Sequence, residues 1–325
     1  MVAILASQIG HGLVPAPEQG RARWPRARRF WGVTAVEQIA KLVAVLALAV
    51  AVLYVVGFTL WTTWISFTDS TLLPNYTFVG IKHYTRLLQT RIWQVAYANL
   101  AIYGFGFMVF ATAIGLLLAI LIDQKVRAEN LLRTIYLYPM ALSFVVTGTV
   151  WSWLLNPGIG IQGFVRGLGW TGFSFGWLVD RDMAIYTVVL AAVWQASGFA
   201  MALFLAGLRS LDADLYKAAQ IDGAGPARMY LRILVPAMWP IVIAVLVILL
   251  QFAIKTYELV RALTAGGPGI ATTLPTTVVY DYMFQRGLMG AGSAAAVMLL
   301  LSLLVIIVPY AIYRRLSARR RIRHG

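Results

Sequence analysis

The sequence predicts an all-α polytopic membrane protein with six transmembrane helices and both termini in the cytoplasm. Of its 325 residues, 60% are hydrophobic and only 12% are charged, whereas a soluble domain carries roughly 25% charged residues. The apolar residues are gathered in long runs, and the Lys and Arg residues between those runs are divided unequally between the two sides. These three observations favour a chain that crosses a bilayer repeatedly.

Six apolar runs are long enough to cross a bilayer, which takes about 20 helical residues. They are Gln38–Ile65, Ala96–Ile122, Thr134–Leu155, Ala184–Leu208, Ala237–Leu259 and Met289–Ile312. They place a transmembrane domain at residues 38–313, with a cytoplasmic tail at 1–37 and a basic cytoplasmic tail at 314–325. The first 30 residues hold no long apolar run, which favours a tail over a cleaved signal peptide.

The distribution of positive charge sets the orientation. Of the 27 Lys and Arg residues, 19 fall in the predicted inner segments and seven in the outer ones, while Lys255 lies inside a span. An excess of positive charge marks the cytoplasmic side. This sorting accounts for the net charge of +15 without a nucleic acid, since a nucleic-acid-binding membrane protein has no need to sort its charges by side.

The sequence lacks the residues that several kinds of chemistry need. The chain has no cysteine, and its three histidines, His11, His83 and His324, are scattered, so no metal site is expected. The Gly-x-x-x-x-Gly-Lys-Ser/Thr loop that cradles nucleotide phosphates is absent. No nucleophile–base pair stands out. We therefore expect no catalysis and no cofactor in this chain.

Four of the five connections between the spans are predicted to be a short inner turn or outer loops. The sequence predicts a short inner turn at Asp123–Arg133, where Asp123 and Glu129 are expected to be solvated. Outer loops are predicted at Phe67–Val95, which includes an interfacial helix, at Pro157–Asp182 and at Arg261–Gln285.

The segment 209–239 is longer and more charged than a connection between spans requires. Asp212 is suited to cap a short helix, and Gly223 to close it in a left-handed conformation. Pro226 suits the first turn of a second helix. Pro236 and Pro240 mark the entry to the fifth span. The segment is predicted to be a helix, a glycine hinge and a second helix lying along the membrane face.

This segment resembles the EAA loop, the cytoplasmic coupling loop of ABC importer permeases. The family pattern of Glu-Ala-Ala, three residues and Gly stands here as Lys217-Ala-Ala-Gln-Ile-Asp-Gly-Ala224, followed by Ile233-Leu-Val-Pro236. Lys217 replaces the Glu that names the loop, so a salt bridge made by that Glu is not expected here. The resemblance implies that six residues contact an ATPase: Lys217, Ala218, Ala219, Asp222, Gly223 and Ala224.

The resemblance extends from about Tyr54 to Arg315. It includes Asn99, Arg133-Thr134, Pro139, Trp151-Ser-Trp-Leu-Leu-Asn-Pro157 and Thr264-Ala-Gly-Gly-Pro-Gly269. This combination is similar to the carbohydrate-uptake, maltose-importer-like permeases, with glucose/mannose-type permeases as the best match. It implies a type I ABC importer permease fold in the bacterial inner membrane and import of a mono- or small oligosaccharide. The implied partners are a second related permease, two ATPase subunits that hold ATP and Mg, and an external substrate-binding protein.

Two stretches are candidates for the substrate pathway. Lys255 and Glu258 lie within the fifth span, three residues apart, and are expected on one face of a helix beside Tyr257. The resemblance aligns Lys255 and Glu258 with sugar-contacting positions. A purely structural ion pair near the end of the span, with the Lys reaching to the interface, is the alternative.

In the fourth span, Trp194 and Gln195 suit a sugar, because an aromatic face covers C–H groups while an amide binds hydroxyls. Gly198 completes this set, and helix packing through small residues is the alternative. An anionic polyol phosphate or acidic sugar is a second substrate class, since Lys255 offers a positive charge. A secondary transporter would account for the spans but not for the Asp222–Gly223 loop.

Overall fold

The computed structural model describes residues 31–323 apart from 74 and 125, without the side chains of 31–36, 306 and 310–323. The basic tail residues before Trp31, His11 and His324 therefore lie outside the described residues. The chain divides into two compact units, residues 1–58 and Thr59–Gly325. In the described part the structure is helical, and Thr68 and Phe78 form one isolated antiparallel bridge.

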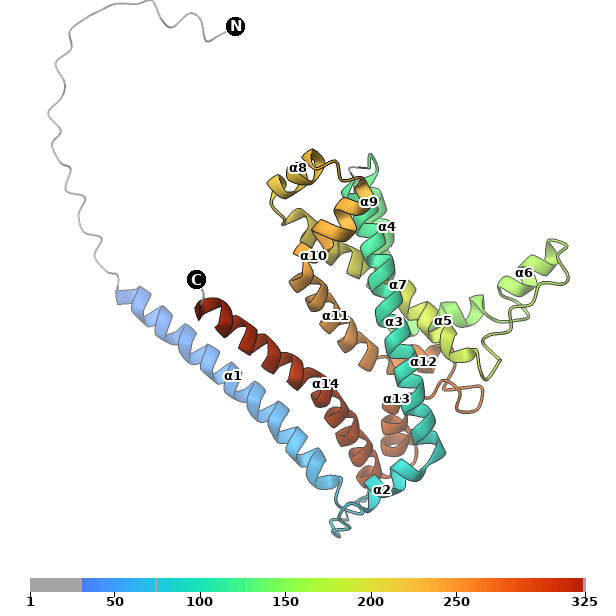
Figure 1. Ribbon diagram of the computed structural model, residues 1–325. Helices are drawn as coiled ribbons and strands as arrows, with labels where there is room; N and C mark the ends of the chain where they lie inside the picture. The colour runs from blue at the N-terminus through green and yellow to red at the C-terminus, as the bar shows by residue number, and fades with distance from the viewer. Residues whose placement is uncertain (1–30, 74, 125, 324–325) are drawn as a thin grey trace, which may run out of the picture. The chain divides into compact units, whose positions relative to one another are not determined.

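Four of the six predicted apolar runs lie each within one helix, namely α1, α3, α7 and α14 (Figure 1). The helix bounds are α1 Trp31–Ile65, α2 Lys82–Gln89, α3 Arg91–Asp123, α4 Glu129–Ala141, α5 Phe144–Leu154, α6 Ile161–Gly167, α7 Ala184–Arg209, α8 Ala213–Ile221, α9 Pro226–Met229, the π-helical turn η1 Tyr230–Leu234, α10 Val235–Ala237, α11 Trp239–Ile254, α12 Tyr257–Leu263, α13 Pro275–Tyr280, η2 Asp281–Gln285 and α14 Met289–Arg323. Four stretches within these helices are long and apolar enough to cross a membrane, and six if each of two bent helix pairs counts as one span.

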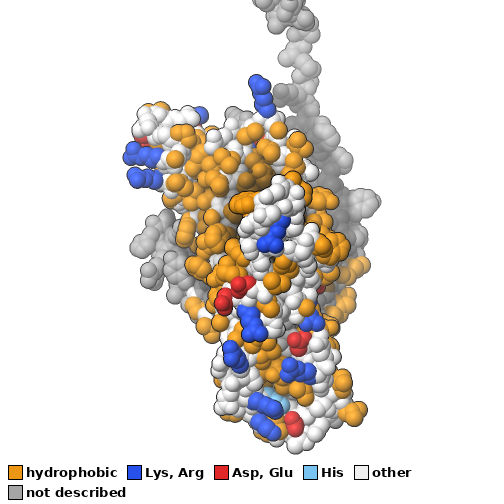
Figure 2. Space-filling view, turned by 90° about the vertical axis from the view of Figure 1, so that its right-hand side faces the viewer, with side chains coloured by type: hydrophobic (Ala, Val, Ile, Leu, Met, Phe, Trp, Pro, Cys, Tyr) orange, Lys and Arg blue, Asp and Glu red, His pale blue; other side chains and the backbone are white. Residues whose placement is uncertain are grey.

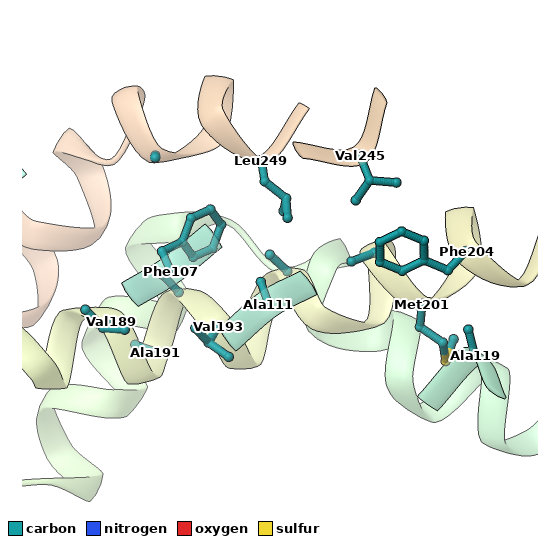
Figure 3. Packing of buried hydrophobic residues seen from close by; sticks show 14 of the residues in the cluster. Phe107, Ala111, Ala119, Val189, Ala191, Val193, Met201, Phe204, Val245 and Leu249 are labelled. Atoms are coloured by element: carbon teal, nitrogen blue, oxygen red, sulfur yellow. The ribbon is translucent and has the colours of Figure 1, made fainter. Parts of the chain in front are cut away.

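The core of the second unit lies where α3, α7 and α11 meet. Figure 3 shows Phe107 and Ala111 of α3 close to side chains of α7, with Leu249 of α11 nearby. Tyr103 and Phe107 are almost fully buried. Small residues on α3 and α7 allow their backbones to approach closely, as is usual for helices packed within a membrane. This packing places the ends of α3 and α7 at one end of the unit, where the segment 209–239 follows.

The third predicted span is not one straight helix. It is the pair α4 and α5, bent by 98° at Leu142–Ser143. Pro139 lies in the last turn of α4, and Ser143 caps α5 by accepting a hydrogen bond from the Val146 amide at 3.3 Å. The Leu142 carbonyl at the bend accepts a hydrogen bond from Gln195 Nε2 at 2.8 Å. A buried amide on α7 therefore satisfies a backbone group that the bend leaves open.

The fifth predicted span is broken as well. α10 and α11 meet at 76° around Met238, between Pro236 and Pro240. α11 ends at Ile254, and α12 begins at Tyr257. The break between α11 and α12 is stabilised by the buried Thr256, whose hydroxyl lies 2.8 Å from the Tyr103 hydroxyl of α3. Lys255 and Glu258 consequently lie on either side of a helix break, so the prediction that they belong to one continuous helix is wrong.

Gly198 is the point of closest approach between α7 and α4. A Cβ atom placed there would lie 1.7 Å from the Tyr136 carbonyl oxygen, which is backbone and cannot move aside alone. We expect Gly198→Ala to separate the two helices and destabilise the protein by about 1–3 kcal/mol. The measurement is the thermal midpoint of the purified protein.

Gly104→Ala on α3 is the matched control, because nothing lies within 4 Å of a Cβ at that position. It should keep or raise the thermal midpoint, since alanine favours helix more than glycine does. Equal midpoints for the two variants would contradict the packing role of Gly198.

Candidate functional site

The segment 209–239 has the predicted helix–hinge–helix structure. α8 begins after Asp212, whose carboxylate accepts a hydrogen bond from the Asp214 amide at 3.0 Å. Gly223 has φ of +68°, a left-handed conformation that glycine adopts without strain. Pro226 then opens α9. We call this part of the chain, residues 209–239, the coupling segment.

The coupling segment is tied to the end of α3 through Asp123. The Tyr230 hydroxyl of η1 donates a hydrogen bond to Asp123 Oδ2 at 2.7 Å, and the Tyr216 hydroxyl of α8 donates to the same oxygen at 3.2 Å. Two elements of the segment, on either side of the Gly223 hinge, are therefore held by one carboxylate. Hydrogen bonds to an ionised acceptor are stronger than neutral ones.

A chain of ion pairs continues from this carboxylate. Arg209, at the end of α7, lies 3.8 Å from Asp123 Oδ1 and 2.8 Å from Glu129 Oε1 at the start of α4. Arg133 lies 2.6 Å from the same Glu129 oxygen. The Asp123 and Glu129 side chains are 10% and 24% exposed, so the expectation that they are simply solvated is wrong. The network joins α3, α4, α7, α8 and η1.

The surroundings of Tyr216 keep its hydroxyl protonated, so that it can donate a hydrogen bond to Asp123. Burial, and then the nearby Asp123 carboxylate, raise the pKa of Tyr216 to about 12. The hydroxyl therefore stays protonated at neutral pH and can donate to the carboxylate. A cavity of ≈ 510 Å³ opens beside this contact, lined by residues that include Asp123, Arg209, Tyr216 and Tyr230.

The sequence reasoning identified the coupling segment but missed what holds it. The available signal was Asp123 at the end of an apolar span, together with Tyr216 and Tyr230 in an otherwise charged segment. A lone carboxylate at a membrane boundary is more often solvated, and only the fold brings Asp123 within hydrogen-bonding distance of residues 93 and 107 positions further along the chain.

The predicted ATPase-contacting residues lie together around the end of α8. Lys217, Ala218, Asp222 and Gly223 are exposed, while Ala219 is buried. In the part of the chain that the structure describes, Lys217 forms its ion pair with Asp214 of the same helix, at 2.9 Å, and both side chains are at least 70% exposed. Beside them the apolar side chain of Ile221 is 85% exposed. An apolar side chain so open at the tip of a short helix is suited to enter a groove of another protein.

The predicted pathway residues of the fifth span lie around the helix break. Lys255 and Glu258 are both exposed, and no ion pair joins them in the described part of the chain. Tyr257 is half-buried, with its ring 4.6 Å from that of Tyr280. Lys255 follows the last residue of α11 and Glu258 lies in the first turn of α12, so each charge also complements the dipole of its own helix.

The predicted pathway residues of the fourth span separate into two kinds. Trp194 is 39% exposed and packs edge-on against Trp151 of α5, with ring centroids 5.8 Å apart. Gln195 is 2% exposed and bonds the Leu142 carbonyl, while Gly198 packs against α4. The structure thus leaves only Trp194 of these three open to a ligand, and it brings Trp194 together with Trp151.

Several helices long and apolar enough to cross a membrane, joined by a hinged, charged segment beyond the ends of α3 and α7, define a polytopic membrane protein. The family model for the inner membrane component of binding-protein-dependent transport systems matches residues 111–322. The chain belongs to that family. It is consequently a multi-pass inner-membrane permease.

Three curated relatives support this membership. A probable ABC transporter permease of Pyrococcus horikoshii is 38% identical over 77% of this chain and 86% of its own length. A xylose/arabinose import permease of Haloferax volcanii is 36% identical over 77% of this chain and 80% of its own. An sn-glycerol-3-phosphate transport system permease of Pectobacterium atrosepticum is 34% identical over 70% of this chain and 77% of its own.

A solved structure shows the same fold. A chain of a bacterial ABC transporter involved in the import of the acidic polysaccharide alginate matches with a TM-score of 0.73. The match covers 87% of this chain and 98% of that chain at 21% identity. The same kind of transporter matches in complex with an alginate-bound periplasmic protein, with a TM-score of 0.72.

Proposed function

We propose that the coupling segment transmits the movement of a separate ATPase to the membrane helices, and that the chain thereby imports a sugar or a related substrate. The observation that carries this proposal is the joint attachment of α8 and η1 to Asp123. A push on α8 reaches α3 through Tyr216, and η1 carries it into α10 and α11. The membrane helices then tilt as rigid bodies, which is how such switches move.

The exposed end of α8 supports docking on another protein. Ile221 is 85% exposed and Leu231 is 61% exposed, although both lie in a segment with many charges. Among the described residues, the ion pair that Lys217 forms is with Asp214 of its own helix, and its side chain is 70% exposed, so its charge is open to a partner. The proposed partners are two ATPase subunits that bind ATP and Mg, a second related permease and an external substrate-binding protein.

The substrate class is proposed from the pathway residues and the relatives. Trp194 and Trp151 offer aromatic faces, which suit the C–H surface of a sugar. Relatives named for xylose/arabinose import and for glycerol-3-phosphate transport support both a neutral sugar and an anionic substrate. The narrower glucose/mannose assignment stays a prediction. A secondary transporter is disfavoured by the family membership.

The hinge provides the direct test of coupling. A Cβ at Gly223 meets nothing within 4 Å, but the φ of +68° disfavours any β-branched or bulky residue. We expect Gly223→Val to cost about 1–2 kcal/mol locally and to reduce ATP-driven uptake on the order of tenfold, while the protein still reaches the membrane. Uptake and ATP hydrolysis are measured together in reconstituted vesicles.

Gly223→Asn is the matched control, because asparagine tolerates the left-handed region. It should retain most of the uptake. Loss of uptake in Gly223→Asn and retention in Gly223→Val would contradict the hinge.

The orientation of the segment is tested by labelling. The chain has no cysteine, so single cysteines report without background. We expect Arg127→Cys, in the turn between α3 and α4, to be protected from an impermeant thiol reagent in intact cells, since positive charge marks the inner side. Gly172→Cys, in the loop between α6 and α7, should react. The reverse pattern would overturn the proposed topology.

A further inference from the structure

A second cavity lies at the other end of α3 from the coupling segment. Its volume is ≈ 470 Å³, and it lies between α2, the first turn of α3, η2 and the start of α14. The side chains that line it include Arg86, Arg91, Arg286, His83 and Asp69. Neither the coupling function nor the substrate pathway uses these residues.

The cavity carries more positive charge than its own acid can balance. Within the described residues, none of Arg86, Arg91 and Arg286 forms an ion pair with a carboxylate. The one acid in the lining, Asp69, lies 3.8 Å from His83 Nε2. Figure 2 shows Lys and Arg side chains gathered around the histidine at the lower end of the molecule. Three guanidinium groups without a carboxylate partner in the described part of the chain favour an anion that arrives from outside.

The backbone adds to this preference. α3 is 33 residues long, and no side chain caps its start. The Thr90 hydroxyl, at the N-cap position, instead donates to the Leu87 carbonyl at 2.7 Å. The first amides of α3 therefore lie next to the arginines with their partial positive charge unmatched by a side-chain cap.

The cavity lies beside the first residues of two helices that are long and apolar enough to cross a membrane. α3 begins at Arg91 and α14 at Met289, so the cavity lies where two membrane helices begin. Two apolar side chains within two residues of the lining residues Thr71 and Arg286 in sequence are open, with Leu73 80% and Phe284 66% exposed. Arginines next to exposed apolar and aromatic side chains are typical of the boundary between headgroups and acyl chains.

We propose that this cavity binds the phosphate of an anionic phospholipid, with Arg86, Arg91 and Arg286 as its ligands. Arg286 is positioned for this role by Tyr282, because its guanidinium carbon lies 4.9 Å from the centre of that ring. A bound phosphate would join α2, α3 and η2 at this membrane face. The assignment to the outer leaflet rests on the orientation given under the proposed function, whereas the binding chemistry does not.

The test compares two double variants of the purified membrane protein. Arg91→Gln with Arg286→Gln removes two charges from the cavity. Lys82→Gln with Arg181→Gln removes two charges predicted to lie at the same membrane face and absent from the cavity lining. Native mass spectrometry counts phosphatidylglycerol retained after detergent washing. We expect retention to fall about tenfold in the cavity variant and to stay at the wild-type level in the other.

Three further arms make the result decisive. Arg91→Lys with Arg286→Lys keeps the charge and should retain most of the lipid even if the glutamine variant is unstable. Diacylglycerol, which lacks phosphate, should not be retained. Inorganic phosphate that binds the cavity while phosphatidylglycerol does not would overturn the lipid as the source, and equal retention in both glutamine variants would overturn the site. Since no arm requires an ATPase, failure here is distinct from failure of the coupling proposal.

Discussion

Asp123→Ala is expected to disconnect ATP hydrolysis from uptake. The substitution leaves the Tyr230 hydroxyl without its acceptor and Arg209 without one of its two acids. It leaves the Tyr216 hydroxyl only its longer hydrogen bond to the Leu208 carbonyl, at 3.4 Å. Each buried donor left unsatisfied costs roughly 1–3 kcal/mol. A loss of about 1.4 kcal/mol in coupling corresponds to a factor of ten, so we expect uptake to fall by at least about tenfold while hydrolysis continues. Both rates are measured in proteoliposomes.

Asp214→Ala is the control for the removal of an acid from the same region. The Asp214 side chain is 80% exposed, and among the described residues its ion pair is with Lys217 of the same helix. It should change uptake little, because exposed pairs contribute roughly 0–1 kcal/mol. Wild-type uptake per ATP in Asp123→Ala would remove the carboxylate from the coupling mechanism.

A double-mutant cycle separates the contact from a general loss of stability. Tyr230→Phe removes the 2.7 Å hydrogen bond and keeps the ring. If the two residues act through that bond, adding Tyr230→Phe to Asp123→Ala should reduce uptake little further. Full additivity of the two effects would show that they act independently.

The apolar runs and the hinge could be predicted from the sequence, because each depends on residues that are close together in the chain. A span needs only length and apolarity, so α1, α3, α7 and α14 were predictable. The turn at Gly223 was predictable because few residues other than glycine adopt a left-handed helix end. Asp212 and Pro226 mark the starts of α8 and α9 for equally local reasons.

The helix breaks and the network around Asp123 could not be predicted, because they depend on residues that are far apart in the sequence. The bend between α4 and α5 is stabilised by Gln195, which comes from another helix 53 residues later. In sequence, Gln195 therefore looked like a sugar ligand rather than a partner for a backbone carbonyl. The break at Lys255–Thr256 likewise depends on Tyr103, 153 residues earlier. Single-sequence patterns carry no information on such distant contacts.

The Lys255→Met and Glu258→Gln variants are each expected to fold normally, so a loss of uptake in either can be attributed to the substrate pathway. Both side chains are exposed and no ion pair joins them in the described residues, so neither substitution leaves a buried charge alone. Expression and thermal midpoint should match those of the unmodified protein. Lys82→Met, an exposed lysine of α2, is the control for the loss of one charge.

The effects of the two single variants on uptake should then depend on whether the substrate is anionic or neutral. A charge within a membrane protein must face water or a protein partner, and a substrate passing the break would meet both side chains. For an anionic substrate, Lys255→Met should lower uptake at subsaturating concentration about tenfold, since a charge-assisted contact contributes roughly 1.5–3 kcal/mol. Glu258→Gln should leave that uptake unchanged or raise it, because it removes a like charge. For a neutral sugar, both variants should lower uptake by similar, smaller factors, because only hydrogen bonds to hydroxyls are lost. The affinity of the external binding protein, measured separately, should not change. If the double variant transports every substrate with unaltered kinetics, Lys255 and Glu258 serve only to complement the ends of α11 and α12, and the pathway lies elsewhere.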